Sequence, residues 1–134
     1  ADEYFDALIS VDSYHYYGNN DEYFEKRLKS LIKKGAPVAI AIPGTKHEMN
    51  GIIPDALKPF LDDEGFATLH CIEWWTQILE KHLDDFMIKE IDCTDKAWSD
   101  WLAADNPIAK QDIDMMKADN GKYLNLISIT GKRK

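Results

Sequence analysis

The sequence predicts an α/β fold whose sheet is mostly parallel, with helices on both faces. Two apolar runs, residues 5–11 and 37–44, are continuous rather than alternating. Such runs are typical of strands that are buried on both faces of a parallel sheet. Residues 21–34 lie between the two runs and carry apolar side chains at helical spacing. The three segments therefore predict a strand, a crossover helix and a second, parallel strand.

The predicted helix over residues 21–34 has signals at both of its ends. Asn20 precedes the helix and supplies a side-chain cap, and Gly35 follows the helix and ends it. One apolar stripe runs along the helix and consists of Phe24, Leu28, Leu31 and Ile32. Pro37 then opens the second strand, at a position where a missing backbone donor is tolerated.

The rest of the chain alternates irregular, helical and strand patterns. Residues 45–65 allow only a short helix near residues 55–61, and His47, Glu48 and Met49 are interpreted as ordinary loop residues. Further along, the apolar spacing predicts a helix at 73–82, a strand at 86–91, helices at 95–104 and 108–118, and a strand at 123–130.

The loop after the first strand carries the densest set of reactive side chains. Residues 12–17 include a carboxylate, a hydroxyl, an imidazole and three phenols. In parallel sheets ligands bind outside the carboxyl ends of the strands, where this loop is expected. His15 is the candidate general base, because imidazole titrates near neutral pH. The alternative is a loop whose rings pack together and whose histidine bonds to the backbone.

Several segments, taken in order, resemble the carboxyl-terminal half of a class I S-adenosylmethionine-dependent methyltransferase. Residues 5–16 look like the fourth strand of that family with its following loop, and residues 38–43 look like the fifth strand. Residues 122–131 look like the antiparallel seventh strand. The resemblance implies a Rossmann-like sheet in which this last strand is inserted between the strands at 38–42 and 86–91.

The resemblance also implies a single domain with an inserted helical cap, at about residues 45–70 and 95–119, that transfers a methyl group to a small molecule. The residues expected to take part in catalysis are His15, Tyr14 and Tyr16. Those expected to contact the cofactor, S-adenosylmethionine, are Ser10, Val11 and Asp12. Those expected to contact the substrate are Tyr17, Trp74 and Trp98. Core packing is the favoured alternative for all four tryptophans, and most of all for Trp75 and Trp101.

The glycine-rich turn that binds the cofactor in this family has no counterpart in the sequence. The seven glycines are too far apart to form it: Gly18, Gly35, Gly44, Gly51, Gly65, Gly121 and Gly131. We therefore expect a fragment or domain of such an enzyme that is inactive alone and binds S-adenosylmethionine weakly or not at all. The strand at 5–11 would then be an exposed apolar edge, which predicts a homodimer through this strand or through the uncovered sheet face beside it.

The composition excludes several classes of function. A formal net charge of −8 argues against a nucleic-acid surface, which needs clustered lysine and arginine. No apolar run approaches the ~20 residues of a membrane-spanning helix. Cys71 and Cys93 lack metal-ligand spacing and are expected to be reduced thiols of a cytoplasmic protein. The acidic pairs and triplets lack the pattern of a calcium loop, so no metal site is expected.

Two functions of other classes stay open. One is a non-catalytic binding or dimerisation module that retains half of the fold. The other is a different α/β enzyme in which His15 acts together with Asp12. The sequence shows no nucleophile elbow or phosphate-binding loop to support this last function. The methyl acceptor, and the atom that is methylated, are not specified by the sequence.

Overall fold

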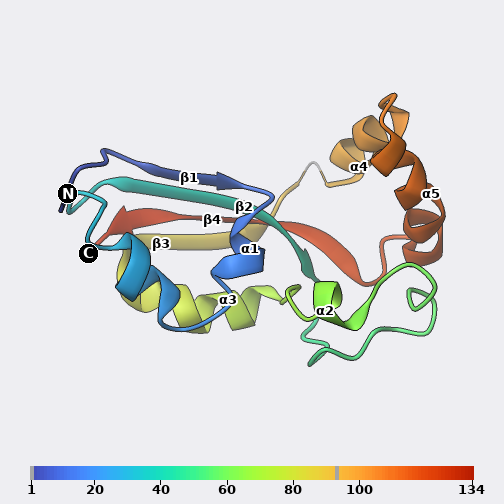
Figure 1. The fold of residues 1–134 in the computed structure, drawn as a ribbon, viewed down its shortest axis with the longest axis horizontal. Coiled ribbons are helices and arrows are strands. Elements are labelled where there is room, and N and C mark those ends of the chain that lie inside the picture. Colours follow the sequence, from blue (N-terminus) through green and yellow to red (C-terminus); the bar gives the residue numbers. More distant parts are fainter. Residues whose placement is uncertain (1, 93) are drawn as a thin grey trace.

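The computed structural model describes residues 2–92 and 94–134, which form a four-stranded sheet with helices (Figure 1). The strands are β1 (Leu8–Val11), β2 (Pro37–Thr45), β3 (Leu83–Glu90) and β4 (Leu124–Arg133). Their order across the sheet is β1-β2-β4-β3. β1 and β2 are parallel, whereas β4 is antiparallel to both of its neighbours. The predicted strand order, with the last strand inserted beside the second, is therefore confirmed.

Away from the strand ends near Thr45 and Leu124, the buried side chains of the sheet lie on one of its two faces. Ile40 and Ile42 of β2 pair with Ile129 and Ile127 of β4, and each of these four side chains is at most 1% exposed. Ile88 of β3 also pairs with Ile129, so it lies on the same face. This face is the floor of the main hydrophobic core.

Short helices of the same chain cover this buried face. They are α1 (Tyr14–Tyr17), the π-helix η1 (Phe24–Leu28), α3 (Ile72–Leu79) and the 3₁₀ turn η2 (Glu80–His82). Figure 1 shows α1, η1 and α3 together along one side of the sheet. Their side chains complete the core with Tyr14, Phe24, Trp75 and Leu79. Trp75 is fully buried, which confirms its predicted role in packing.

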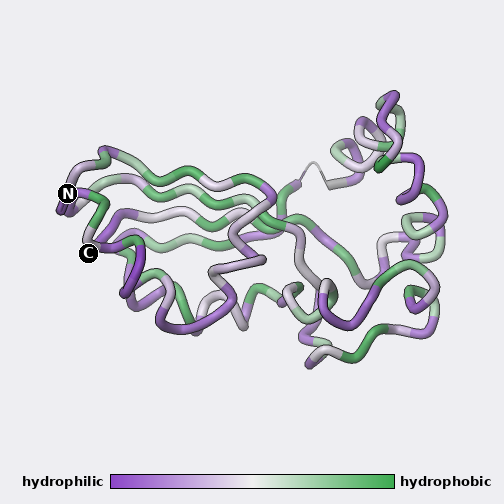
Figure 2. The backbone as a smooth tube through the Cα atoms, viewed as in Figure 1, coloured by the Kyte–Doolittle hydropathy of each residue, from purple (hydrophilic) through white to green (hydrophobic). Residues whose placement is uncertain are grey.

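Over β1 and β3 the opposite face of the sheet is open, so the expected helices on both faces are not found over these two strands among the described residues. Ile9 and Val11 of β1 are 76% and 70% exposed, and Met87 of β3 is 57% exposed. Figure 2 shows that β1 and β2 are hydrophobic along most of their length. Their continuous apolar pattern predicts burial on both faces. The helices α1, η1 and α3, which follow these strands, pack on the same face, and the described residues leave Ile9, Val11 and Met87 of the other face exposed.

Two predicted helices differ from those in the structure. The segment predicted as a helix at 21–34 forms only the π-helix η1, with turns on both sides. Residues 55–60 form turns, and the helix expected near residues 55–61 is replaced by α2 (Asp63–Phe66). Pro59 prevents a regular helix at 55–61 because it has no backbone donor. The Asp62 side chain instead accepts a hydrogen bond from the Gly65 backbone and caps α2.

The remaining helices form a hairpin beyond the strand ends. α4 (Thr94–Ala103) and α5 (Pro107–Asp119) follow β3 and precede β4, and Figure 1 shows them beyond the arrowhead of β1. Asn106 caps α5 by accepting a hydrogen bond from the Ile108 backbone. Asn120 and Gly121 have φ angles of 46° and 69° and turn the chain into β4. A second, smaller core lies beneath this part of the molecule and includes Leu57, Phe66 and Leu124.

Three further expectations concern Trp101, the two cysteines and membrane-spanning helices. Trp101 of α4 is half-buried and donates its indole N–H to Asp112 of α5, at 2.8 Å. Cys71 is a buried free thiol at the start of α3, and the expectation for Cys93 lies outside the described residues. No helix within the described ranges is both long and apolar enough to span a membrane.

Candidate functional site

The carboxyl ends of three strands meet at one edge of the sheet. β1 and β2 are parallel, and β3 points in the same direction because both β2 and β3 are antiparallel to β4. The edge therefore carries Val11, Thr45 and Glu90, the last residues of these strands. Ligands of open α/β sheets bind outside this edge. Two groups of side chains lie there: the loop after β1, and a cleft beneath the α4–α5 hairpin.

Three hydroxyl groups come together where β1 ends. The Ser10 and Ser13 oxygens are 2.9 Å apart, and the Tyr17 phenol lies 3.4 Å from the first and 3.3 Å from the second. Asp12 stands between the two serines in the chain, with an exposed side chain and a φ of 51° that reverses the backbone. Val11 points to the open face and is 70% exposed. The loop thus presents a cluster of hydroxyls beside an accessible carboxylate.

His15 lies in α1 and is only 2% exposed. Its ring contacts that of the exposed Tyr16, with the centroids 4.0 Å apart. Its Nδ1 has no hydrogen-bond partner among the described residues. Burial lowers the pKa of His15, an effect that the nearby Asp12 carboxylate partly offsets. A neutral imidazole with a free nitrogen can accept a proton near pH 7, which is the property that a general base needs.

Tyr14 packs in the main core behind the loop. It is 1% exposed and its ring contacts those of Trp75 and Tyr17, with centroid distances of 6.0 and 5.6 Å. Burial raises the pKa of its phenol far above the usual range, and the charges of Tyr23 and Tyr17 add to this effect. The hydroxyl therefore stays protonated at neutral pH, and its ring supports the loop from below.

Trp74 lies beside a pair of polar residues, His70 and Glu48. The rings of Trp74 and His70 stack with centroids 3.6 Å apart and an interplanar angle of 6°. His70 Nδ1 lies 3.1 Å from the Glu48 carboxylate, and the same carboxylate accepts a hydrogen bond from the Cys71 backbone. Gly44 permits the close approach of this segment, since a Cβ there would lie 2.7 Å from the His70 carbonyl oxygen.

The sequence did not indicate the His70–Glu48 pair. Glu48 was interpreted as a loop residue, and His70 lies 22 positions away. Neither residue belongs to a recognisable local motif, because only the fold brings them together. Their one local signal is the position of Glu48 shortly after the second strand. Trp74 and His70 extend a continuous series of ring contacts that runs from Tyr17 through Tyr14 and Trp75.

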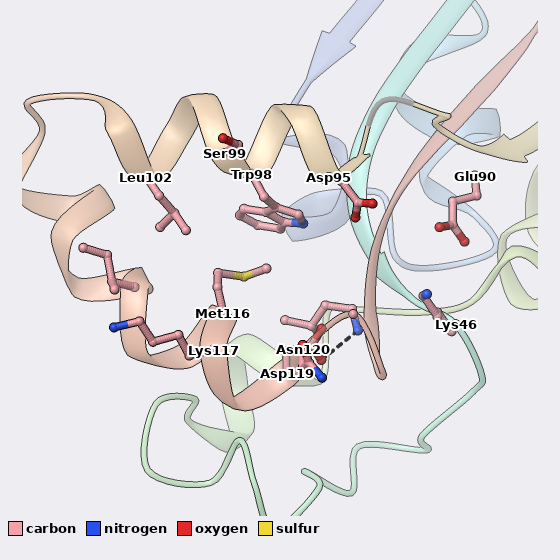
Figure 3. Close-up of a pocket in the computed structure, with 13 residues that line it drawn as sticks. Lys46, Glu90, Asp95, Trp98, Ser99, Leu102, Met116, Lys117, Asp119 and Asn120 are labelled. Carbon is pink, nitrogen blue, oxygen red and sulfur yellow. Dashed lines mark hydrogen bonds between the residues drawn. The ribbon is translucent and has the colours of Figure 1, made fainter.

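A cleft of about 640 Å³ lies between the α4–α5 hairpin and the carboxyl edge of the sheet. Trp98 and Leu102 point from α4 toward Met116 on α5 and form its apolar part (Figure 3). Lys46, which directly follows β2, and Glu90, the last residue of β3, line the side nearest the sheet. The predicted substrate residue Trp98 therefore lines a cleft, although the structure does not bring it into contact with the loop after β1.

The cleft also contains a buried carboxylate. Asp119 is 1% exposed, and its Oδ1 accepts hydrogen bonds from the backbone of Tyr123 and Leu124, at 3.0 and 3.1 Å. Its Oδ2 has no partner within the described part of the chain. Asn125 is 2% exposed and donates to the Glu90 carboxylate at 3.2 Å, which holds that side chain at the cleft.

Comparison with known proteins supports the fold. No protein-family model matches the sequence, and no curated protein does either. Among solved structures, phosphoethanolamine N-methyltransferase 2 of Haemonchus contortus with S-adenosylmethionine matches 99% of the chain, with 16% identity and a TM-score of 0.69. Geranyl diphosphate C-methyltransferase of Streptomyces coelicolor A3(2) matches 99%, with 14% identity and a TM-score of 0.66.

A third match is a putative sarcosine dimethylglycine methyltransferase of Galdieria sulphuraria, with 12% identity over 98% of the chain and a TM-score of 0.61. The chain covers 34%, 48% and 54% of these three structures, respectively. It thus spans between about a third and about a half of their length. The likeness shows a shared fold, with this chain corresponding to part of it.

Proposed function

We propose that this chain, which has the fold of part of a class I S-adenosylmethionine-dependent methyltransferase, forms the acceptor-binding part of an enzyme that methylates a small molecule. The observation that carries the proposal is the position of the reactive loop and the cleft at the same carboxyl edge of a methyltransferase-like sheet. Neither the alternative of a non-catalytic module nor that of a different α/β enzyme has a comparable observation in its favour.

The described residues suit one end of the cofactor. S-adenosylmethionine supplies a methyl group bound to a positively charged sulfur, from which a nucleophile can take it. The exposed Asp12 carboxylate, with the Ser10 and Ser13 hydroxyls beside it, suits the ammonium of the methionine part. The nucleotide part needs a close approach of the backbone, which closely spaced glycines allow. The seven glycines here are dispersed, so we expect these 134 residues alone to bind the cofactor weakly or not at all and to be inactive.

The side chains of the loop and cleft are proposed to remove a proton, to support the loop and to contact the acceptor. His15 is the proposed base for the proton that the acceptor loses, and Tyr16 lies against its ring. Tyr14 supports the loop from the core, and Tyr17 presents a phenol beside the serines. Trp74 and Trp98 present apolar surfaces for the acceptor, one next to His70 and one inside the cleft. Holding the acceptor in one orientation is itself a large part of catalysis for such a transfer.

The proposal is tested with the native polypeptide that carries these residues. Transfer of a tritiated methyl group from S-adenosylmethionine is measured with a panel of small amines, alcohols, thiols and phosphate esters. We expect at least one class to be methylated, and we expect His15→Ala to lower turnover by about 10²–10⁴-fold, because a general base is lost. Binding of the cofactor should change much less.

The exposed His47 provides the matched control. His47→Ala should retain the turnover of the unchanged protein, because its side chain lies outside the loop after β1. Unchanged turnover in His15→Ala across the accessible pH range would remove His15 from the site. Absence of methyl transfer to every class in the panel would contradict the proposed function itself.

A further inference from the structure

We propose that the cleft beneath the α4–α5 hairpin binds a small organic ammonium ion, with its N–H groups directed at Asp119 and its apolar body against Trp98. The inference rests on the proposed function only where it takes this ligand to be the methyl acceptor. The binding site itself rests on the cleft, its charge and an unsatisfied buried oxygen.

The carboxylate oxygen Oδ2 of Asp119 lacks a hydrogen-bond donor among the described residues. Asp119 is 1% exposed, and the two backbone N–H groups that it accepts both reach its Oδ1. No donor from the described residues reaches Oδ2. A buried carboxylate oxygen without a hydrogen bond is unfavourable, and a charged N–H donor is its strongest partner. Because Asp119 lines the cleft, a ligand in the cleft can supply that donor.

The charges around the cleft favour a cation. Three carboxylates line it, from Glu90, Asp95 and Asp119, against two ammonium groups, from Lys46 and Lys117. Lys117 also lies 3.6 Å from the exposed Asp114, outside the lining, so part of its charge is already offset. The whole chain carries a formal charge of −8, which adds to the attraction. An anion would instead have to approach the buried carboxylate.

The cation is organic rather than a metal ion. The three carboxylates come from the end of β3, the start of α4 and the end of α5, and the described residues contain no group of three or more side chains placed to hold a metal. The apolar half of the cleft would also be unused by a bare ion. Trp98 and Met116 offer a ring face and a thioether to a hydrocarbon body (Figure 3).

The requirement for N–H groups narrows the ligand class. A quaternary ammonium carries no N–H and cannot satisfy Asp119 Oδ2, whereas a primary or secondary ammonium can. A cleft of about 640 Å³ lies within the range of small-molecule sites. The geometry therefore favours a primary or secondary alkylammonium or arylalkylammonium with a body of several carbon atoms.

The test uses n-butylammonium and 2-phenylethylammonium as probes. Their binding to the full chain is followed by the indole N–H signal of Trp98 in two-dimensional NMR, assigned with Trp98→Phe, and by titration calorimetry. We expect a saturable shift of the Trp98 signal. The neutral 2-phenylethanol and the trimethylated ammonium should each bind about tenfold more weakly or worse, because each lacks the charge or the N–H.

Asp119→Asn is the decisive variant. Its carbonyl oxygen can keep both backbone hydrogen bonds to Tyr123 and Leu124, while its amide replaces Oδ2 with a donor and removes the charge. We expect affinity for 2-phenylethylammonium to fall about tenfold or more, with an unchanged far-ultraviolet dichroism spectrum. Glu90→Gln, which retains the side-chain volume, should weaken binding by a smaller factor. The control Asp114→Asn removes an exposed charge of the same helix outside the cleft and should leave affinity unchanged.

The outcomes separate the two proposals. If neither ammonium shifts the Trp98 signal at about 10 mM, or if Asp119→Asn binds as well as the unchanged chain, the inference is overturned. Ammonium binding with no methyl transfer by the native polypeptide would support the site and reject the proposed function. Methyl transfer only to acceptors without nitrogen, together with no ammonium binding, would support the proposed function and reject the ammonium site.

Discussion

The two faces of the sheet carry apolar side chains of similar kind but differ strongly in how far these are buried. On the covered face Ile40, Ile127 and Ile129 are at most 1% exposed beneath α1, η1 and α3. On the open face Ile9, Val11 and Met87 are more than half exposed. Apolar side chains are therefore buried on one face of the sheet and exposed on the other, in neighbouring strands. The difference shows that, within the described residues, helices cover β1 and β3 on one face and leave these strands exposed on the other.

The open face continues around the edge of the sheet. β1 is the outermost strand and pairs only with β2 within the described residues. Its free edge carries no proline, and Ile9 and Val11 stand beside unpaired backbone groups. Exposed apolar edges of this kind favour pairing with another chain. The covered face should therefore govern the stability of the fold, and the open face its association.

The largest expected effect is the loss of a side chain from the core that α3 forms with the covered face. Trp75→Ala should lower the free energy of unfolding by about 3–5 kcal/mol, because it removes a fully buried ring and leaves a cavity. Met87→Ala on the open face should change it by about 0.5 kcal/mol or less. Urea denaturation of both variants at the same low protein concentration is the measurement. Equal effects of the two substitutions would contradict the proposed difference between the faces.

The second effect concerns association through the open face. We expect the chain to form a symmetric dimer at micromolar concentration, through β1 or the face beside it. Val11→Lys should weaken this dimer about tenfold or more, because it places a charge in an apolar contact, as measured by sedimentation equilibrium. Ile108→Lys alters an apolar residue on α5 that is also more than half exposed, and it serves as the control. A clean monomer of the unchanged chain at these concentrations would refute the prediction.

The third effect is a loss of stability in acid that arises on the covered side. His82 is 6% exposed and stacks on Phe24, and burial lowers its pKa, with the Glu25 carboxylate opposing the shift. The unfolded chain, with the ordinary histidine pKa of about 6.5, then binds the proton more readily. Stability should fall as the pH decreases below this value, until the folded pKa is reached, with a slope of at most about 1.4 kcal/mol per pH unit for each such histidine.

His82→Phe should reduce this slope, and the remaining part should come from His15, whose pKa is lowered in the same direction. The exposed His47 is the control, and His47→Asn should keep the full slope. Denaturation curves between about pH 5 and pH 8 give the comparison. A stability that rises as the pH falls through this range would show that the histidines are stabilised in their charged form.

The smallest effect is expected for an ion pair on the open side. Lys132 of β4 lies 2.8 Å from the Asp85 carboxylate, and the two side chains are 58% and 72% exposed. Hydrogen bonding to Lys132 lowers the pKa of Asp85, yet water screens an exposed pair of this kind. Lys132→Ala should leave the denaturation midpoint unchanged within experimental scatter at moderate salt. A clear decrease would mean that this pair is shielded, for example by association.

Much of the fold could be predicted because it depends on local patterns. The apolar runs at 5–11 and 37–44 and the turn at Asn120 and Gly121 each specify their own conformation. The order of the segments, through resemblance, also led to the confirmed insertion of the last strand. The π-helix at 24–28 was not foreseen, because its apolar stripe has ordinary helical spacing.

The candidate site was only partly predictable, because local patterns do not contain the contacts between distant residues. The loop at 12–17 could be identified from its density of reactive groups after a strand. The burial of His15, however, depends on how α1 packs beside β2, and that of Tyr14 on its contact with Trp75 from a distant helix. No local pattern contains these contacts.

By itself the sequence determined the positions of the four strands and of the helices α3, α4 and α5, because apolar periodicity and turn residues act over a few neighbouring positions. Only the tertiary structure decided which face of the sheet the helices cover, because a strand that is apolar on both faces is compatible with either. It alone joined Glu48 to His70, and it placed Asp119 in the cleft with Glu90 and Trp98. Those contacts connect residues that are far apart in the chain, so the forces that create them act only when the sheet and the hairpin have come together.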